Sequence, residues 1–353
     1  MRSKPKKLLI ILFSFIVLLL ALEVAVRIWA PQEIMSDVMV LGKDLCHQLK
    51  KNTKFVQRSN EFYVESRISS QGLRDIEYFP KNGTDIYRVL VLGDSHTFGW
   101  GVDDQDIFPK VLQRRLNFHG TKTKYEVINT GTMGYGTGHE YQFLKNVGLG
   151  FKPDLVLIAM DWLHDIENNN NYYTIQDLRL IRNSKRCWFS NSRTIVQYIP
   201  GSFFLRENSQ LFKFAGIKIL SKLNLIKSWF RESEESAGNS SFNAYDLTVT
   251  KGIFNLLKEE IDALGIKLAV VLLPEMRSYN KELLRSFEQF LTIKQFDFVS
   301  LIDKLDKSPN SSDFTFARSP HFNSKGHRFL AEQMEKFLKS KDLVAHGFTQ
   351  KRQ

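Results

Sequence analysis

Apolar, strand-like runs alternate with amphipathic, helix-like segments from residue 87 almost to the end of the chain. The strand-like runs are RVLVLG, YEVINTG, PDLVLIAM, IKLAVVLLP and FDFVSLID, and apolar residues recur at helical spacing in 107–118, 139–148, 250–265, 280–291 and 323–340. Such alternation is typical of a parallel sheet with helices on both faces. The run PDLVLIAM is apolar almost throughout, as in strands covered on both sides. The sequence therefore predicts a three-layer α/β/α sandwich with a mostly parallel sheet.

The alternation is absent from two stretches of the chain. Residues 31–84 show no strong period, and we interpret them as a linker with a lead-in to the first strand. Residues from about 168 to 243 are rich in Asn, Ser, Arg and aromatic residues, which indicates an insertion beside the site. The predicted domain spans 85–343, and residues 344–353 form a tail. The chain of 353 residues, 43% of them hydrophobic, is long enough for one large domain with additions.

The N-terminal segment combines a basic cap with an apolar run. Four Lys and Arg residues lie in 1–7, and the following run 8–30 begins with 15 uncharged residues, LLIILFSFIVLLLAL. A helix over 8–30 would be about 34 Å long, enough to cross a bilayer. A cleaved signal peptide is the alternative, but its apolar part is shorter and ends in a small-residue cleavage site. We therefore expect an uncleaved, single-pass anchor in a bacterial inner (cell) membrane, with 1–7 cytoplasmic and the domain periplasmic or otherwise extracytoplasmic.

The net charge limits the classes of binding partner to be expected, and the cysteine content bears on the cellular compartment. The formal net charge is +11, yet four of the positive charges lie in the N-terminal cap and the others are scattered, so we expect no nucleic-acid partner. An anionic glycan, a membrane surface or simple solubility accounts better for the charge. The two cysteines, Cys46 and Cys187, would be allowed to pair in an oxidising compartment, and the sequence leaves open whether they do.

Three chemically rich turns follow predicted strands. They are GDS at 93–95, NTGTMGYGTG at 129–138 and DWLHD at 161–165. Ligand sites of open parallel sheets form outside the carboxyl ends of the strands, so these turns should converge. Ser95 would open a helix there, where its hydroxyl and N–H lie near the positive end of the helix dipole.

A nucleophilic serine needs a base to remove its proton. Among the eight histidines, His321 in SPHFNSKGHRFL is the best candidate, because it lies in a predicted Pro-flanked loop just before a helix. His327, six residues further on, is expected to be solvated. The residues thus predict a Ser95–His321 pair.

Taken together, GDS, the Asn-x-Gly-x-x-Gly of 129–134, the polar turn after PDLVLIAM and the His-x-Asn-x-x-Gly-His of 321–327 resemble the SGNH hydrolases, also called the GDSL esterase/lipase family. The likeness covers about 88–338, and the anchor followed by QGLRD and GDSHTFGWGV is similar to membrane-anchored bacterial members. The resemblance implies a flavodoxin-like sandwich. It also implies that Ser95 is the nucleophile and first oxyanion donor, Gly134 the second donor and His321 the base.

Two positions depart from the family pattern. His164 stands where the family has an oxyanion-binding Asn, although an imidazole can also donate a hydrogen bond. The Asp expected two or three residues before the base is missing, so the nearest upstream acid, Asp313, becomes the candidate orienting group. Loss of one oxyanion donor costs about 2.7–4 kcal/mol in known systems, and a misoriented histidine about 10⁴ in kcat. A retained site and a degenerate one both remain open.

The resulting hypothesis is a membrane-tethered serine esterase acting on an ester, such as the O-acyl groups of an envelope or exported polysaccharide. An O-acyltransferase of the same fold and a non-catalytic glycan-binding protein are the alternatives. GTMGYGTG lacks the Lys-Ser/Thr of a phosphate-binding loop, so we expect no nucleotide or other cofactor. Asp161, His164 and Asp165 with His321 could be drawn as a metal site, but nothing fixes their geometry, so we expect no metal.

Overall fold

The computed structural model describes residues 4–29, 34–35, 38–42, 45–81, 85–118, 123–182, 205, 209–212, 214–215, 246–274, 279–305 and 311–344. The chain divides into two compact units. One consists of Met1–Ser36, Val56–Tyr63 and Arg193–Phe242, and the other of Asp37–Phe55, Val64–Ser192 and Asn243–Gln353. All of the predicted site residues belong to the second unit.

Helix α1 (Lys4–Trp29) contains the apolar N-terminal run. Its segment Lys6–Trp29 has a mean hydropathy of 3.0, and most of its large apolar side chains are exposed. Among the described residues it is the one helix that is long and apolar enough to cross a membrane, a property that a signal sequence shares.

Residues 31–84, expected to be a linker with a lead-in, contain five short strands. They are β1 (Ile34–Met35), β2 (Met39–Leu41), β3 (His47–Leu49), β4 (Thr53–Arg58) and β5 (Tyr63–Ile68). Strand β1 pairs antiparallel with β4, and β2 with β3. Strands of two to six residues are too short for an alternating pattern to stand out in the sequence.

The central sheet confirms the predicted parallel arrangement. Its strands are β6 (Ile86–Gly93), β7 (Lys124–Asn129), β8 (Leu155–Met160), β11 (Lys267–Leu272) and β12 (Asp297–Ser300). The order is β12-β11-β8-β6-β7, and all four pairings are parallel. Counted along the chain this order is 2-1-3-4-5, the flavodoxin-like arrangement, and its topological switch point lies between β6 and β8.

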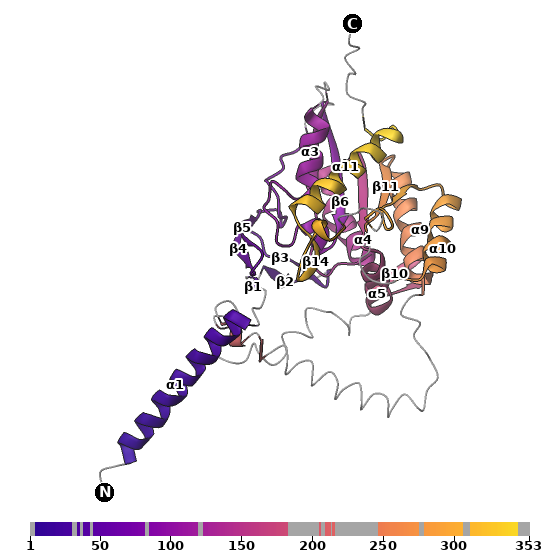
Figure 1. Ribbon diagram of the computed structural model, residues 1–353. Helices are drawn as coiled ribbons and strands as arrows, with labels where there is room; N and C mark the ends of the chain where they lie inside the picture. The colour runs from indigo at the N-terminus through magenta and orange to yellow at the C-terminus, as the bar shows by residue number, and fades with distance from the viewer. Residues whose placement is uncertain are drawn as a thin grey trace, which may run out of the picture. The chain divides into compact units, whose positions relative to one another are not determined.

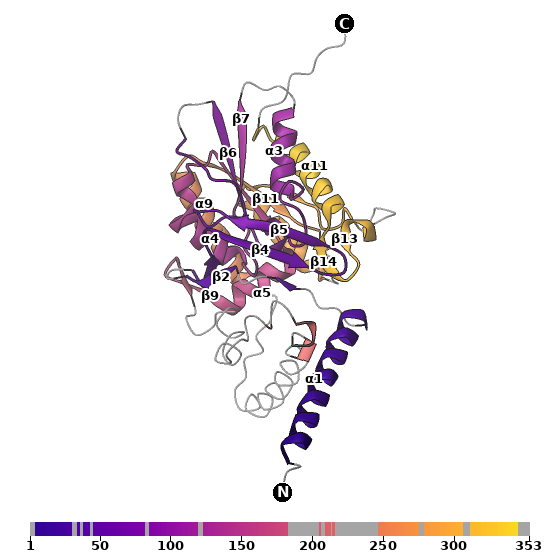
Figure 2. The same ribbon diagram turned by 90° about the vertical axis from the view of Figure 1, so that its left-hand side faces the viewer.

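Helices cover both faces of this sheet, as the alternation predicted (Figures 1 and 2). The helices of one face are α3 (Phe108–Phe118) and α11 (Ser324–Ser340), and those of the other are α4 (Thr137–Asn146), α9 (Thr248–Ala263) and α10 (Lys281–Ile293). Successive side chains of β6 serve the two layers, because a strand points them alternately to opposite faces. Val89 and Val91 belong to the core cluster with α3 and α11, and Leu90 and Leu92 to the other.

His327 of α11 contributes to this packing and is not solvated as expected. Its ring is buried, and its Nδ1 accepts a hydrogen bond of 3.0 Å from the N–H of Phe108 at the start of α3. The prediction considered only the helical position and not the neighbouring helix that covers it.

The region predicted as an insertion begins inside helix α5 (Trp162–Tyr172), which is followed by the antiparallel strands β9 (Tyr173–Gln176) and β10 (Arg179–Arg182). Most of the remainder, with Cys187, lies outside the described residues. Cys46 is buried and disulfide-bonded.

Candidate active site

The nucleophile candidate lies at the switch point of the sheet. Strand β6 ends at Gly93, and the short helix α2 (Ser95–Phe98) begins at Ser95. Asp94 caps this helix, because one of its carboxylate oxygens accepts the N–H of His96 at 2.8 Å. Within the described part of the chain the N–H of Ser95 makes no hydrogen bond, so it is available to an incoming oxyanion.

The loop after β7 lies directly against α2. A Cβ built on Gly131 would stand 2.1 Å from the backbone nitrogen of Phe98, so only glycine allows this approach. Gly134, the second predicted oxyanion donor, has a φ of +75°, and its N–H has no acceptor among the described residues. The sheet therefore brings both predicted backbone donors to the same edge.

His321 reaches Ser95 from the C-terminal part of the chain. It lies in strand β14 (Ser319–Phe322), which pairs antiparallel with β13 (Thr315–Phe316), and not in the predicted loop. Its Nε2 is 2.9 Å from Oγ of Ser95. This distance places the predicted base within reach of the predicted nucleophile's proton.

Ser319 contacts the other ring nitrogen of His321, with Oγ 2.8 Å from Nδ1. Residues two apart in a strand point to the same side, which is why Ser319 and His321 can meet. With the ring proton on Nδ1, the imidazole donates to Ser319 and leaves Nε2 free to accept from Ser95. Sequence reasoning missed this serine because the proline beside it suggested a loop.

Asp313, predicted to orient the base, is not in this position. It lies in the short 3₁₀ helix η3 (Ser311–Phe314), where its half-exposed carboxylate is 3.8 Å from Nζ of Lys325. Its backbone carbonyl accepts a hydrogen bond from Asn323, the residue that caps α11. The seven residues between Asp313 and His321 include a strand and a turn, so sequence proximity did not translate into contact.

Two further histidines surround the nucleophile and are paired with carboxylates. His96 Nε2 lies 3.5 Å from Asp161, and His164 Nδ1 lies 3.4 Å from Asp94. Burial alone would lower the pKa of both histidines, but the nearby acids outweigh it. Asp94 and Asp161 raise the pKa of His96, and Asp165 and Asp94 raise the pKa of His164 to about 11. Burial likewise opposes charge on Asp94, yet His96 and His164 hold its pKa well below the usual range. His164 is thus an imidazolium at neutral pH, and the acids around His96 shift that ring toward the same charged form.

His321 behaves in the opposite way. Burial and the positive charge of His96 lower its pKa to about 3, so the ring is neutral over most of the pH range. The ring of His96 lies 5.0 Å from that of His321, and Trp100 covers it at 5.6 Å. A neutral imidazole is the form that can accept the serine proton.

His164, the third predicted oxyanion donor, lies in the first turn of α5. Its side chain is 32% exposed, and Asn168, one helical turn further along α5, has its amide nitrogen 3.1 Å from His164 Nε2. The same amide nitrogen is 3.4 Å from the carbonyl oxygen of Gly134. Asn168 therefore lies beside both predicted donors, a position visible in the sequence only through its i+4 spacing from His164.

The donor atoms of Asp94, Asp161 and His164 lie within 4.8 Å of one another and could hold a metal ion. Carboxylate and imidazole ligands of this kind suit zinc. Both carboxylates already have histidine partners, His96 for Asp161 and His164 for Asp94, at 3.5 and 3.4 Å. The residues described hold no motif for a nucleotide cofactor.

The lead-in segment supports both catalytic turns. Arg74 is buried and donates to the carbonyl oxygens of Phe98, Gly99 and Val102, at 3.2, 2.6 and 2.6 Å. The next residue, Asp75, accepts the N–H of Asn129 at 2.8 Å. The motif QGLRD therefore holds the turn that carries Ser95.

His47 of β3 supports the oxyanion loop. Its Nε2 is 2.7 Å from the carbonyl oxygen of Met133, and its own carbonyl accepts the hydroxyl of Tyr135 at 2.7 Å. These two bonds bracket Gly134 on either side. Nothing in the spacing of the sequence pointed to this contact.

No protein-family model matches the sequence, and no curated protein does. Solved structures with a similar arrangement include a lipase/acylhydrolase from Enterococcus faecalis, at 15% identity over 72% of this chain and 96% of that chain, with a TM-score of 0.42. An esterase from Pseudoalteromonas is similar at 14% identity over 72% and 98%, with a TM-score of 0.40. An acetyl xylan esterase shares 14% identity over 70% and 98%, with a TM-score of 0.39. At such low identities and TM-scores, the chemistry of this site rests on its own geometry.

Proposed function

We propose that the protein is a serine esterase in which Ser95 is the nucleophile and His321 the base. The observation that carries this proposal is the continuous chain from Ser95 Oγ through the imidazole of His321 to Ser319 Oγ, with distances of 2.9 and 2.8 Å. As Ser95 Oγ attacks the ester carbonyl, its proton passes to Nε2 of His321. The imidazolium then returns the proton to the leaving alkoxide, and a water molecule repeats the cycle to release the acid.

The oxyanion of the tetrahedral intermediate would be held by the N–H groups of Ser95 and Gly134. His164, positively charged beside Asp94, adds a charge of the correct sign near the same place. Fixed donors and charges of this kind act on charge that develops in the transition state. In this proposal His164 replaces the amide donor that the sequence lacks at that position.

Ser319 orients the base without adding a charge. By accepting the Nδ1 proton it keeps Nε2 directed at Ser95, which is the orienting part of the work of a carboxylate. A hydroxyl cannot stabilise the imidazolium by charge, so the base is weaker than in a Ser-His-Asp triad. This weakness keeps a binding-only site as the second candidate.

The substrate we propose is an O-acyl group of an envelope or exported polysaccharide, presented to a domain tethered by α1. The long apolar helix and the sequence resemblance support this choice. Attack on the acyl-enzyme by a sugar hydroxyl in place of water would make the same site an acyltransferase. A C-terminal reporter active only outside the cytoplasm, in a protein that stays with membranes after a salt wash, is the expected topology result; cytoplasmic reporter activity would contradict it.

The test of the proposed function is covalent labelling by a serine-directed fluorophosphonate, with the labelled peptide located by mass spectrometry. The full-length protein in detergent should be labelled at Ser95, and Ser95→Ala should not be labelled at all. Ser340→Ala, at the far end of α11, is the matched control and should label like the wild type. Equal labelling of the wild type and Ser95→Ala would show that this serine is not the reactive group.

A further inference from the structure

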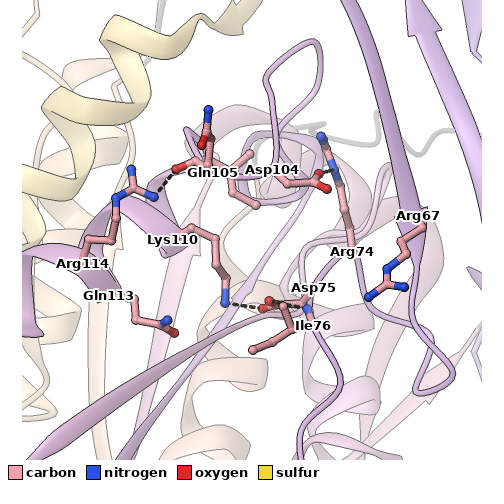
Figure 3. A pocket seen from close by; sticks show the side chains of 10 residues that line it. Arg67, Arg74, Asp75, Ile76, Asp104, Gln105, Lys110, Gln113 and Arg114 are labelled. Carbon is pink, nitrogen blue, oxygen red and sulfur yellow. Dashed lines mark hydrogen bonds and ion pairs between the residues drawn. The ribbon is translucent and has the colours of Figure 1, made fainter.

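A pocket lies beside Arg74, and none of the proposed catalytic residues lines it (Figure 3). Its volume is about 350 Å³, and its lining comes from β5, the segment after it, the loop before α3 and α3 itself. The lining residues are Arg67, Arg74, Asp75, Ile76, Asp104, Gln105, Ile107, Lys110, Gln113 and Arg114. Four cations and two carboxylates give this pocket an excess of positive charge.

Both carboxylates of the pocket are already satisfied by internal partners. Asp75 is 2.7 Å from Nζ of Lys110, and Asp104 is 2.9 Å from Nε of Arg74 (Figure 3). Asp75 also accepts the N–H groups of Ile76 and Asn129, and Asp104 accepts the hydroxyl of Ser66. The acceptors of the pocket are therefore used within the protein, as are two of its four cations.

Arg67 of β5 supplies the first uncommitted cation. Its guanidinium points toward the segment 74–76 in Figure 3, and within the described ranges it forms no hydrogen bond or ion pair. Glu77 is an acid that senses the charge of Arg67, but both carboxylate oxygens of Glu77 accept from Ser70, one from its N–H and the other from its hydroxyl. The guanidinium fork of Arg67 is thus open to a ligand.

Helix α3 supplies two more donors. Arg114 donates one N–H to the carbonyl oxygen of Gln105, and four of the five N–H donors of its guanidinium group remain. The side-chain oxygen of Gln113 accepts the N–H of Val127 at 2.9 Å, so its amide nitrogen is held in a fixed orientation and has no acceptor among the described residues. The pocket offers hydrogen-bond donors and positive charge, and almost no vacant acceptor.

We propose that this pocket binds a sugar-sized organic anion, a molecule that carries a carboxylate or a phosphate group. Such groups are acceptors only, and guanidinium forks match them in a bidentate manner. The volume lies at the lower end of the range for small-molecule sites, larger than a bare phosphate needs. Ile76 and Ile107 give the body of the ligand an apolar wall. This proposal does not rest on the proposed esterase function. Binding of a ligand to the pocket can be measured without any esterase activity.

Ligand-detected NMR titrations of the full-length protein in detergent test this assignment, with glucuronate, glucose 6-phosphate, glucose and inorganic phosphate as probes. At least one sugar anion should bind, and glucose should bind about tenfold more weakly or worse, because it lacks the charge-assisted bonds. Raising the salt from about 0.05 to 0.5 M should weaken the binding, since exposed charges are then screened. The better of the two anions identifies the ligand group.

Substitutions of pocket residues test whether the sugar anion binds in this pocket. Arg67→Gln and Arg114→Gln should each weaken the sugar anion about tenfold, the scale for losing one charge-assisted contact. Arg285→Gln, an exposed arginine on α10, is the matched control and should bind like the wild type. All three should keep the melting temperature of the wild type. Glucose binding as tightly as glucuronate and glucose 6-phosphate, inorganic phosphate binding as tightly as glucose 6-phosphate, or no effect of either pocket variant would each overturn the proposal.

Discussion

The turn that carries Ser95 and the hairpin that carries His321 are built in contrasting ways. The turn follows a central strand, and the buried Arg74 holds its carbonyl groups through three hydrogen bonds. The hairpin of β13 and β14 has strands of two and four residues, and its contact with the imidazole of His321 is a neutral hydroxyl. The turn of the proposed nucleophile is therefore fixed by charge-assisted hydrogen bonds, whereas Nδ1 of the proposed base, His321, faces an uncharged hydroxyl.

The Ser95 turn therefore sets the geometry of the site, and the surroundings of His321 set the pKa of the proposed base. Changes at the Ser95 turn should act on folding, because they expose or orphan buried groups. Changes beside His321 should act on proton transfer and its pH dependence. The following experiments test that division, beginning with the largest expected effect.

Replacing His321 by Ala should lower kcat for an aryl acetate by about 10⁴ or more, since it removes the base and leaves the oxyanion donors in place. The measurement is Ser95-dependent hydrolysis under saturating substrate. His327→Gln, in the same C-terminal region but bonded to Phe108, serves as the comparison and should lose stability while keeping catalysis in the folded fraction. Full activity of His321→Ala would remove the base from the proposal.

His164→Ala should lower kcat by about 10² to 10³, the scale for one oxyanion donor, with little change in KM because the interaction is made mainly in the transition state. His164→Asn restores an amide donor and should keep more activity than the alanine variant. Steady-state kinetics on the same aryl acetate measure both. If the alanine variant turns over at the wild-type rate, His164 is not a donor, and a site without Ser95-dependent turnover on any ester would favour the binding-only candidate.

Arg74→Met should destabilise the fold by about 3 kcal/mol, because it leaves three carbonyl groups without their donor and each costs about 1 kcal/mol or more. Equilibrium urea unfolding in detergent measures the change in free energy of unfolding. The control variant Arg285→Met replaces an exposed arginine and should change the free energy of unfolding by no more than about 0.5 kcal/mol. A kcat loss in the folded fraction of Arg74→Met without loss of stability would contradict the division of roles.

Ser319 should show the smallest change in rate and the clearest change in pH dependence. Ser319→Ala loses a single neutral hydrogen bond, about 0.5–1.5 kcal/mol, so kcat should fall about tenfold or less. With a pKa of about 3, His321 stays neutral as the pH falls from 7 to 5, and wild-type kcat/KM should hardly change in that window. A histidine with its ordinary pKa of about 6.5 would lose most of its activity there.

Ser319→Asp places a carboxylate beside Nδ1 and should raise the pKa of His321 by about 1–3 units. The fall of kcat/KM on the acid side then begins at a higher pH. The ratio of kcat/KM at pH 8 to kcat/KM at pH 5 should therefore be larger for the variant than for the wild type. Ser319→Thr keeps the hydroxyl and should retain the wild-type profile. An acid limb that stays in place in Ser319→Asp would show that this position does not govern the base.

The strand and helix alternation was predictable because long apolar periods survive in a single sequence. The same holds for Ser95 and for His321, which the structure brings to 2.9 Å. Ser319 was not found, since Pro320 suggested a loop and a four-residue strand on the edge of a hairpin tolerates a proline. Asp313 is the nearest acid upstream of His321 in the sequence, but contact depends on the direction of the strand and not on the type of side chain.

The pKa shifts of the histidines in the site also could not be predicted from the sequence. The pKa of His96 is raised by Asp94 and Asp161, and the pKa of His164 by Asp165 and Asp94, because the fold brings these acids beside the two rings. The support from Arg74 was hidden for another reason, because a buried arginine in an irregular segment leaves no periodic pattern. Such contacts join segments that are remote in the chain, and a single sequence carries no record of them.

The hydrogen bond between Ser95 and His321 joins residues that are 226 positions apart. During synthesis at about 5–20 residues per second, the nucleophile half would exist for about 10–45 s before the ribosome adds its base. A chain that has not yet reached residue 321 therefore contains Ser95 without its proposed base. In the proposed mechanism the serine becomes reactive only when the last hairpin and helix have been added.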